Sequence, residues 1–319
     1  AIPVRTGALT RVPIGVLADK IGGRATLQII LLATAGPVFL VSHVNSYGMA
    51  LVLALGVGLA GSSFAAGIAW VSAWYPAEHK AFALGIFGMG NIGASLTQLA
   101  APALITLVPA SGLAGGLIGG GWRFVPALYA GLLVACAFLV RLFVPGPDRK
   151  PAGSRTVKDL TRPLKHMRVW RFGFYYMTVF GAFVGVSLWL PKYYVDNYHV
   201  ELRTAGFLAA LFVIAASLIR PVGGAFSDKF GGRNVMLVSL GTSATMSLLL
   251  TFPMALHEFA TIVVLLGLGL GIGTAAVYSY IPQYFPEDVG AVGGRVGAIG
   301  AGGGFVLPLT FTLVINISH

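Results

Sequence analysis

The chain of 319 residues is 56% hydrophobic and only 10% charged, and its mean hydropathy is +0.85. A soluble domain typically carries about 25% charged residues, so this composition excludes a water-soluble globular protein. The formal net charge is +11, but segment 141–171 alone supplies seven of these charges, and a basic connection between apolar runs is typical of a cytoplasmic loop. Nucleic-acid binding is therefore not expected. The single Cys136 can form no disulfide within the chain.

Ten apolar runs follow one another along the chain, each long enough to cross about 30 Å of hydrocarbon as a helix. They are uniformly apolar, whereas the strands of a membrane barrel would alternate over about 10 residues. The predicted spans are 1–18, 25–43, 48–74, 81–107, 122–145, 171–194, 205–226, 234–252, 258–281 and 290–317. The sequence therefore predicts an all-α polytopic membrane protein.

Lysine and arginine are concentrated in the connections on one side of the predicted bundle. These connections are 19–24, 78–80, 141–171 and 228–233. By the positive-inside rule this side is cytoplasmic. We therefore expect a multi-pass protein of the plasma membrane, which is the inner membrane of a bacterium.

A charged string near the start of the chain occurs twice. The arginine, glycine, aspartate, lysine, double glycine and closing arginine of 11–24 all recur in 220–233, at an offset of 209 residues. The same offset relates three further spans of each half, which predicts two repeated halves. Two spans lack a counterpart, so we expect about twelve helices in the intact protein, with the first and last missing here. The predicted domains are an N-terminal half at 1–145, a basic cytoplasmic linker at 146–170 and a C-terminal half at 171–319.

Arg11 and Arg220 each lie inside an apolar span, eight residues before the aspartate of their charged turn. At 1.5 Å per residue, both are about 12 Å from the cytoplasmic end of their helix. An arginine at such a depth costs roughly 2.5–3.5 kcal/mol and by default indicates a functional site. All ten acidic residues fall in loops or at helix ends, so no carboxylate partner is visible. Because a guanidinium matches a planar oxyanion bidentately, the pair predicts a bound small anion such as nitrate or nitrite.

Two glycine-rich stretches, 85–95 and 293–305, lie in spans that the repeat relates. The first formally matches a dinucleotide fingerprint, but no strand precedes it and no acid follows at the required distance, so we reject that match. Close helix packing is expected for most of these glycines. The glycines concerned are Gly85, Gly88, Gly90, Gly93, Gly294, Gly297, Gly300 and Gly303. Asn91 lies among them and needs a polar partner, either the substrate or a neighbouring helix.

Three aromatic residues are candidates for the same site. Tyr176 and Phe180 are four residues apart and share a helix face, and Phe64 lies in a run of small residues. Aromatic residues in membrane helices commonly only pack, so the residues alone leave this role open. Arg5 and Arg295 also interrupt apolar runs, but neither is expected in the site. All six histidines lie in loops or at the terminus, so no metal site, cofactor or enzymatic activity is expected.

The chain resembles the nitrate/nitrite porter family of the major facilitator superfamily. The turn at 15–24 and its copy at 224–233 are similar to the inter-helix motif of the superfamily. The two glycine-rich spans are similar to the paired nitrate signatures of the family, and Arg11 and Arg220 occupy the positions of its paired substrate arginines. The resemblance implies the major facilitator fold. It also implies that Phe64, Tyr176 and Phe180 line the anion pocket, with Asn91 nearby.

These observations predict a monomeric secondary active transporter of nitrate and/or nitrite that works by alternating access in nitrate assimilation. The charged turns would set the balance between inward-facing and outward-facing states through Asp19, Arg24, Asp228 and Arg233. An antiporter exchanging nitrate for nitrite is chemically simplest, because no carboxylate or histidine inside the ten spans could carry a proton. Proton symport, transport of another small or organic anion, and a transporter-like sensor remain alternatives.

Overall fold

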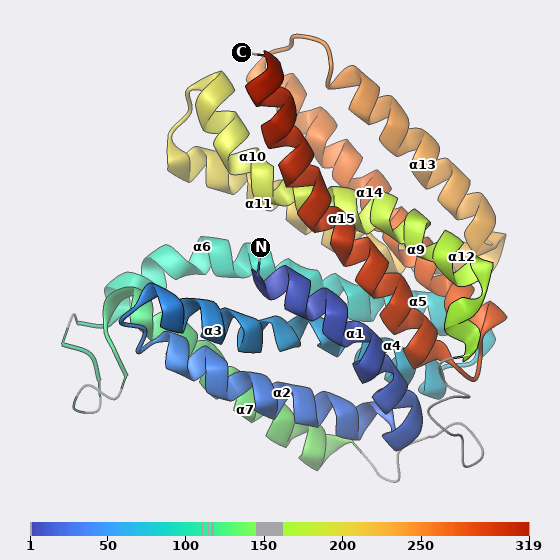
Figure 1. Cartoon of the computed structure of the whole chain (residues 1–319). Helices are drawn as coiled ribbons and strands as arrows, with labels where there is room; N and C mark the ends of the chain where they lie inside the picture. Colours follow the sequence, from blue (N-terminus) through green and yellow to red (C-terminus); the bar gives the residue numbers. More distant parts are fainter. Residues whose placement is uncertain (1, 110, 114, 116–117, 145–161, 319) are drawn as a thin grey trace.

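The computed structural model describes residues 2–109, 111–113, 115, 118–144 and 162–318. Within this part of the chain the apolar runs are helical and no β-strand forms, apart from one isolated bridge between Leu113 and Ile118. Figure 1 shows two helical bundles, one containing the helices up to α7 and the other those from α9 onward.

The first bundle contains five helical spans, two of which are interrupted by a 3-10 turn. They are α1 (Ile2–Ile21); α2 (Gly23–Val41); α3 (Tyr47–Gly58) with η1 (Leu59–Ser62) and α4 (Ser63–Trp74); α5 (Lys80–Gly88) with η3 (Met89–Asn91) and α6 (Ile92–Leu107); and α7 (Phe124–Phe143). Two short turns, η2 (Ala77–His79) and η5 (Gly121–Arg123), precede α5 and α7.

The second bundle also contains five spans, and η6 (Arg162–Lys165) precedes the first of them. They are α9 (Met167–Tyr176) with the π-helical turn η7 (Met177–Gly181) and α10 (Ala182–Tyr198); α11 (Leu202–Leu218) with α12 (Arg220–Phe230); α13 (Gly232–Leu249); α14 (Leu256–Tyr284); and α15 (Val289–Ser318). A large apolar core lies mainly in this bundle, around Tyr176, Phe212 and Ile281.

The helices follow every predicted span, so the all-α class is confirmed. Seven of the described helical segments are long and apolar enough to cross a membrane. Most of the predicted linker 146–170 lies outside the described residues, and the helix predicted at 171–194 already begins at Met167 and ends at Tyr198. The apolar pattern alone placed this start late because Arg168 and Arg171 lower the hydropathy of the first turn.

The two charged turns are built alike. Gly22 and Gly231 occupy the same position in the repeat and have φ values of 98° and 81°, a region that side chains with a Cβ rarely enter. Each glycine separates two helices, α1 from α2 and α12 from α13, without a longer loop. The repeat seen in the sequence therefore reflects a repeated backbone conformation.

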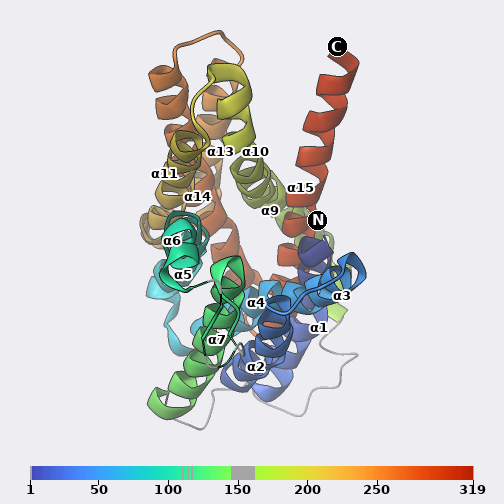
Figure 2. The ribbon, with the colours of Figure 1, turned by 90° about the vertical axis from the view of Figure 1, so that its left-hand side faces the viewer.

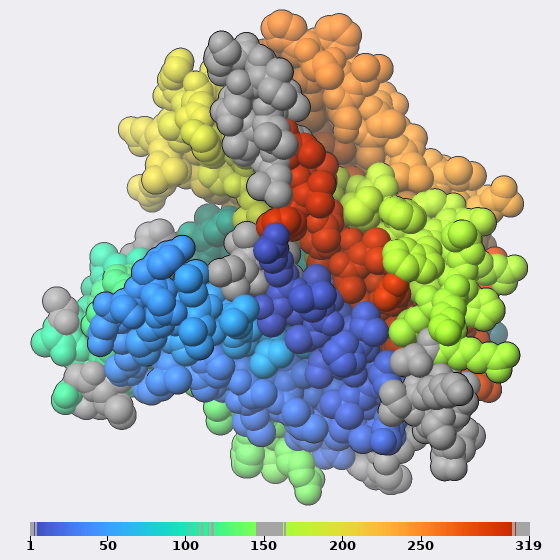
Figure 3. All heavy atoms as spheres, in the orientation of Figure 1, coloured from blue at the N-terminus to red at the C-terminus, as the bar shows by residue number. Residues whose placement is uncertain are grey.

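The two bundles meet at the end that carries these turns. There α1 packs on α15 through Gly15 and Gly290, and α12 packs on α5 through Gly224 and Ala81, with no room for a Cβ on any of the three glycines. At the opposite end the bundles separate (Figures 1 and 2), and the space-filling view shows a hollow between them (Figure 3). The molecule is thus closed at the end predicted to be cytoplasmic and open at the other.

Candidate functional site

Several spans lose their regular α-helical geometry near the two arginines. The breaks are η1 before Phe64, η3 at Asn91, the π-helical turn that contains Phe180, and the interruption at Ile219. The last has a clear cause, since Pro221 has no N–H and its ring disfavours continuation of a helix. In a membrane protein such breaks are tolerated where the irregular backbone faces protein or a polar cavity. They place carbonyl groups within reach of the arginine side chains.

Arg11 on α1 is 8% exposed and bonds to the backbone of both bundles. Its Nε donates to the carbonyl oxygen of Gly61 in η1 at 2.9 Å, and its Nη1 donates to that of Gly297 in α15 at 2.6 Å. The guanidinium carbon also lies 5.7 Å from the centre of the Phe180 ring. The side chain is therefore held between its own bundle and the glycine-rich helix of the other.

Arg220 is 1% exposed and is held in a corresponding way. Its Nη1 donates to the carbonyl oxygen of Gly88 at 2.8 Å. When the Asn91 amide is oriented by its hydrogen-bond network, its oxygen accepts from Nη1 and, at 3.2 Å, from Nη2. The guanidinium carbon lies 6.0 Å from the centre of the same Phe180 ring. Each arginine thus bonds to the glycine-rich helix of the opposite bundle.

Most of the predicted signature glycines lie where helices approach closely. A Cβ on Gly88 would be 3.2 Å from Cδ of Arg220, and a Cβ on Gly297 would be 3.1 Å from Nη1 of Arg11. The remaining close contacts are those of Gly85 with the Arg220 backbone, Gly294 with the Arg11 backbone, Gly300 with Tyr176, and Gly303 with Met177 and Gly181. Gly90 and Gly93 differ, since a Cβ on either would have no neighbour within 4 Å.

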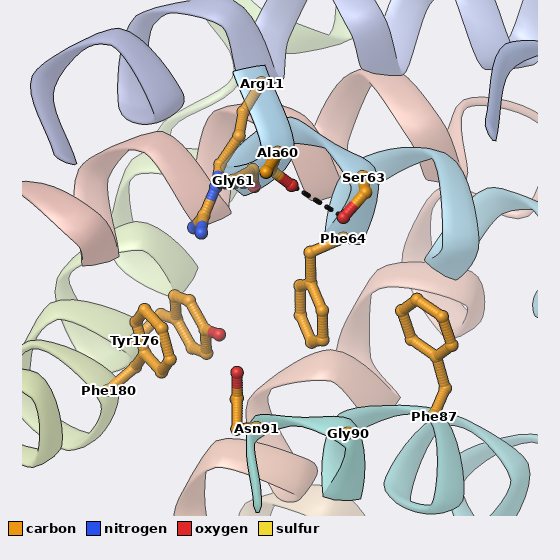
Figure 4. A pocket seen from close by; sticks show the side chains of 10 residues that line it. All are labelled: Arg11, Ala60, Gly61, Ser63, Phe64, Phe87, Gly90, Asn91, Tyr176 and Phe180. Carbon is orange, nitrogen blue, oxygen red and sulfur yellow. Dashed lines mark hydrogen bonds between the residues drawn. The ribbon is translucent and has the colours of Figure 1, made fainter. Parts of the chain in front are cut away.

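A cavity of about 290 Å³ lies between the bundles beside Arg11 (Figure 4). About 10–15 Å³ of such space holds one water molecule, so a small oxyanion fits with room to spare. The lining residues are Arg11, Ala60, Gly61, Ser63, Phe64, Phe87, Gly90, Asn91, Tyr176 and Phe180. Arg220 is not among them, but it contacts two residues that are, Asn91 and Phe180.

Aromatic rings form much of the cavity wall. Tyr176 and Phe180 stack with their ring centres 4.8 Å apart, and Phe64 stacks on Phe87 at 5.3 Å. Phe87 and Tyr278, which meets Phe64 edge-on at 5.2 Å, were not singled out from the sequence. The position of Phe87 inside a run of glycines could have indicated a cavity-lining residue. Small neighbours leave space beside a helix, and a large ring among them can face that space.

The aspartates of the charged turns bond to helix N-termini of the opposite bundle. Asp19 accepts from the backbone N–H groups of Gly290 and Ala291, at 2.8 and 2.7 Å. Asp228 accepts from those of Ala81 and Phe82, at 3.0 and 2.9 Å. A carboxylate at a helix N-terminus satisfies otherwise unbonded N–H groups and interacts favourably with the helix dipole.

The arginines of the charged turns differ from each other. Arg24 donates from Nη2 to the carbonyl oxygen of Arg141 at the end of α7, at 2.9 Å. Arg233 is exposed in the first turn of α13. The aspartates of the two turns therefore make corresponding contacts, whereas the closing arginines do not.

The other two arginines in apolar runs pack against aromatic rings away from the cavity wall. The Arg5 guanidinium lies 4.3 Å from the centre of the Phe305 ring, and that of Arg295 lies 4.3 Å from Trp170. A cation over an aromatic face is stabilised electrostatically, which explains how each charge is tolerated. Among the described residues, no cluster of histidine, cysteine and acidic side chains could hold a metal ion.

The all-helical architecture of the described residues and the buried arginine pair are typical of a membrane transporter. The sequence profile of the Major Facilitator Superfamily matches residues 2–308, and the chain belongs to that superfamily, within it to the nitrate/nitrite porter family that its signatures resemble. It is therefore a transporter rather than an enzyme, and a multi-pass protein of the bacterial plasma membrane.

Three bacterial relatives cover nearly the whole chain. It is 49% identical to the "Probable nitrate/nitrite antiporter NarK1" of Thermus thermophilus, with 98% of this chain and 74% of the relative aligned. It is 33% identical to the "Probable nitrate/nitrite transporter NarK2" of Mycobacterium tuberculosis, over 97% of this chain and 77% of the relative. It is 30% identical to the "Nitrite extrusion protein" of Bacillus subtilis, over 99% of this chain and 77% of the relative.

Solved structures agree with the fold. The human organic anion transporter MFSD10 has a TM-score of 0.76 at 17% identity, covering 97% of this chain and 75% of that one. The fucose:proton symporter FucP of Escherichia coli also has a TM-score of 0.76, at 16% identity, covering 99% and 83%. At such low identity these neighbours establish the major facilitator architecture and nothing about substrate.

Proposed function

We propose that this protein exchanges nitrate and nitrite across the membrane by alternating access, binding one anion between Arg11 and Arg220. The observation that carries the proposal is the pair of buried guanidiniums, both within 6.0 Å of the centre of the Phe180 ring and each bonded to the opposite bundle. Among the described residues neither makes a salt bridge. A buried charge without a counter-charge is costly, and a bound anion supplies that counter-charge.

The chemistry of the cavity favours a small, planar, weakly hydrated anion. Arg11 offers guanidinium N–H groups, and Asn91, with its oxygen turned to Arg220, leaves its amide NH₂ for the cavity. The aromatic faces of Phe64, Tyr176 and Phe180 suit a flat, delocalised group better than a strongly hydrated one. The names of the bacterial relatives, which mention nitrate and nitrite, support the same substrates.

The way in which the two bundles meet supports alternating access. The cavity lies between them, and the end with the charged turns is closed by contacts of α1 with α15 and of α12 with α5. This arrangement corresponds to a state open toward the predicted outside. Release to the cytoplasm requires these contacts to separate, which also moves the backbone carbonyls that position each arginine.

We expect the aspartates of the charged turns to stabilise this outward-open state. Asp19→Asn or Asp228→Asn removes a charge that accepts two backbone hydrogen bonds from the opposite bundle. Charge-assisted bonds contribute about 1.5–3 kcal/mol each, so the outward-open population should fall on the order of 10-fold or more. Distances between spin labels on the two bundles, placed at the cytoplasmic ends, measure this shift.

The control for this prediction is Asp196→Asn. Asp196 accepts a 2.6 Å bond from Lys192, but this ion pair is exposed on one helix and does not join the bundles. Its loss should cost well under about 1 kcal/mol and leave the distances unchanged. Equal distances in all three variants and the unmodified protein would refute the role of Asp19 and Asp228.

Exchange is favoured over proton symport by the lining of the cavity. No Asp, Glu or His is among the described residues around it, so no ordinary proton-carrying side chain faces the anion. In proteoliposomes containing the full-length protein, uptake of isotopically labelled nitrate should require internal nitrite or nitrate. Uptake driven by an imposed proton gradient into vesicles without internal anion would instead establish symport.

A further inference from the structure

Tyr278 on α14 lies directly behind the cavity wall. Its ring meets Phe64 of the opposite bundle edge-on at 5.2 Å and Tyr176 edge-on at 4.7 Å, and both of these residues line the cavity. The side chain is 3% exposed. It lies six residues before the end of α14, or about 9 Å from the predicted cytoplasmic end of that helix. Tyr278 is thus on the cytoplasmic side of the proposed anion site.

The hydroxyl group of Tyr278 has no adequate partner. It faces the hydroxyl of Tyr176, and neither makes a hydrogen bond of good geometry to any other described atom. One bond between the two hydroxyls would use only one of their two hydrogens, so at least one O–H remains without an acceptor. More than about 90% of buried polar groups in proteins are satisfied, so this pair is an exception that calls for an explanation.

The Arg11 guanidinium is close to this hydroxyl but cannot accept its hydrogen. A Cβ built on Gly297 would lie 3.1 Å from the Tyr278 hydroxyl oxygen and 3.1 Å from Nη1 of Arg11, so these two atoms are no more than about 6 Å apart. A guanidinium only donates hydrogen bonds. Tyr278, Tyr176 and Arg11 therefore bring hydrogen-bond donors together at one place with too few acceptors, which is the arrangement that an anion completes.

We propose that Tyr278 is a further substrate-binding residue, whose hydroxyl donates a hydrogen bond to an oxygen of the small oxyanion held by Arg11. This inference rests on the proposed function. An oxyanion bound bidentately by a guanidinium still has oxygen lone pairs that can accept from other donors. An O–H···O⁻ bond is among the stronger hydrogen bonds in proteins. The hydroxyl is enclosed in the outward-open state, so the contact forms as the site rearranges around the anion or turns toward the cytoplasm.

The chain supplies a matched control for the loss of a tyrosine hydroxyl. Tyr194 on α10 is 0% exposed, its hydroxyl also lacks a partner, and its ring meets Phe259 edge-on at 5.6 Å. It lies in the same bundle but near the opposite end from the charged turns, away from the cavity lining. Tyr194→Phe therefore repeats the chemical change of Tyr278→Phe without touching the proposed site.

The test is calorimetric titration of the purified full-length protein with sodium nitrate, together with melting temperatures with and without nitrate. For Tyr278→Phe we expect the nitrate Kd to rise about 10-fold, the loss of one charge-assisted hydrogen bond. The melting temperature without nitrate should stay the same or rise, because phenylalanine removes an unsatisfied buried hydroxyl. Tyr194→Phe should bind nitrate with the same Kd as the unmodified protein.

A structural role for Tyr278 gives the opposite pattern. A lower melting temperature without nitrate, combined with an unchanged nitrate Kd, would overturn the inference, as would an equal rise of Kd in Tyr194→Phe. If the unmodified protein binds no nitrate, the proposed function itself fails. If it binds nitrate and Tyr278→Phe binds it equally tightly, only the role of Tyr278 fails.

Discussion

Replacing Arg220 by lysine should reduce nitrate uptake into proteoliposomes by at least about 100-fold while the protein stays folded. The guanidinium of Arg220 bonds to the Gly88 carbonyl and the Asn91 amide at the same time, and its carbon lies 6.0 Å from the centre of the Phe180 ring. A lysine ammonium is a point charge that cannot hold this planar arrangement. Losing two charge-assisted bonds of about 1.5–3 kcal/mol each lowers affinity by two decades or more.

Arg203→Lys is the appropriate control. Arg203 is an exposed residue near the start of α11, the helix that leads into α12, and it is far in sequence from the break at Ile219. The substitution likewise replaces a guanidinium by an ammonium without changing the net charge, but it should not alter uptake. Undiminished uptake by Arg220→Lys, measured beside this control, would contradict the assignment of Arg220 to the site.

Gly85→Ala should prevent closure of the end that carries the charged turns. A Cβ on Gly85 would lie 2.5 Å from the carbonyl oxygen of Arg220 and 2.8 Å from Cα of Pro221, which are backbone atoms that cannot move aside alone. The added methyl must push α5 and α12 apart. Overpacking typically costs about 1–3 kcal/mol, so the outward-open state should lose on the order of 10- to 100-fold in population, and transport should fall with it.

Gly93→Ala is the control within the same glycine-rich stretch. A Cβ at Gly93 has no heavy atom within 4 Å, so transport and the distance between the bundles should stay unchanged. Spin-label pairs across α5 and α12 measure that distance, in a background where the exposed Cys136 is replaced by serine. Equal distances and equal transport in Gly85→Ala and Gly93→Ala would mean that Gly85 does not join the two bundles closely.

The sequence was sufficient to predict the helical spans and the burial of Arg11 and Arg220. Helices in a membrane must satisfy their backbone groups internally, so long apolar runs have few alternatives. Arg11 and Arg220 stood out because a charge in such a run is expensive. Gly22 and Gly231 also confirm that the repeat extends to backbone conformation.

The partners of the two arginines could not be predicted in this way. Arg11 bonds to Gly297, which is 286 residues away, and Arg220 bonds to Gly88 across 132 residues. Neither acceptor is a side chain, so no residue type indicates it. Only the relative position of the two bundles determines which carbonyl each guanidinium reaches, and that position depends on packing along whole helices.

The roles of the aromatic residues were also not predictable from the sequence. Nothing in the sequence distinguishes Tyr278 from the many aromatic residues that only pack. Arg5 and Arg295 are explained only by the rings of Phe305 and Trp170, which are distant in sequence and lie beside them in the structure. Gly90 and Gly93 fit the glycine pattern as well as Gly88 does. Of these three glycines, only Gly88 lies in close contact with a neighbouring side chain, that of Arg220. Which face of a glycine-rich helix meets a neighbour depends on small rotations that the residue spacing does not define.

We propose that Arg11 and Arg220, one from each bundle, bind the same anion. Nitrate affinity measured in the full-length protein, in Arg11→Lys, in Arg220→Lys and in the double variant distinguishes a shared site from two independent ones. If both side chains bind one anion, the losses are not additive, and the double variant binds nitrate little worse than either single variant. Additive losses would mean that the two arginines act independently and would contradict a shared site.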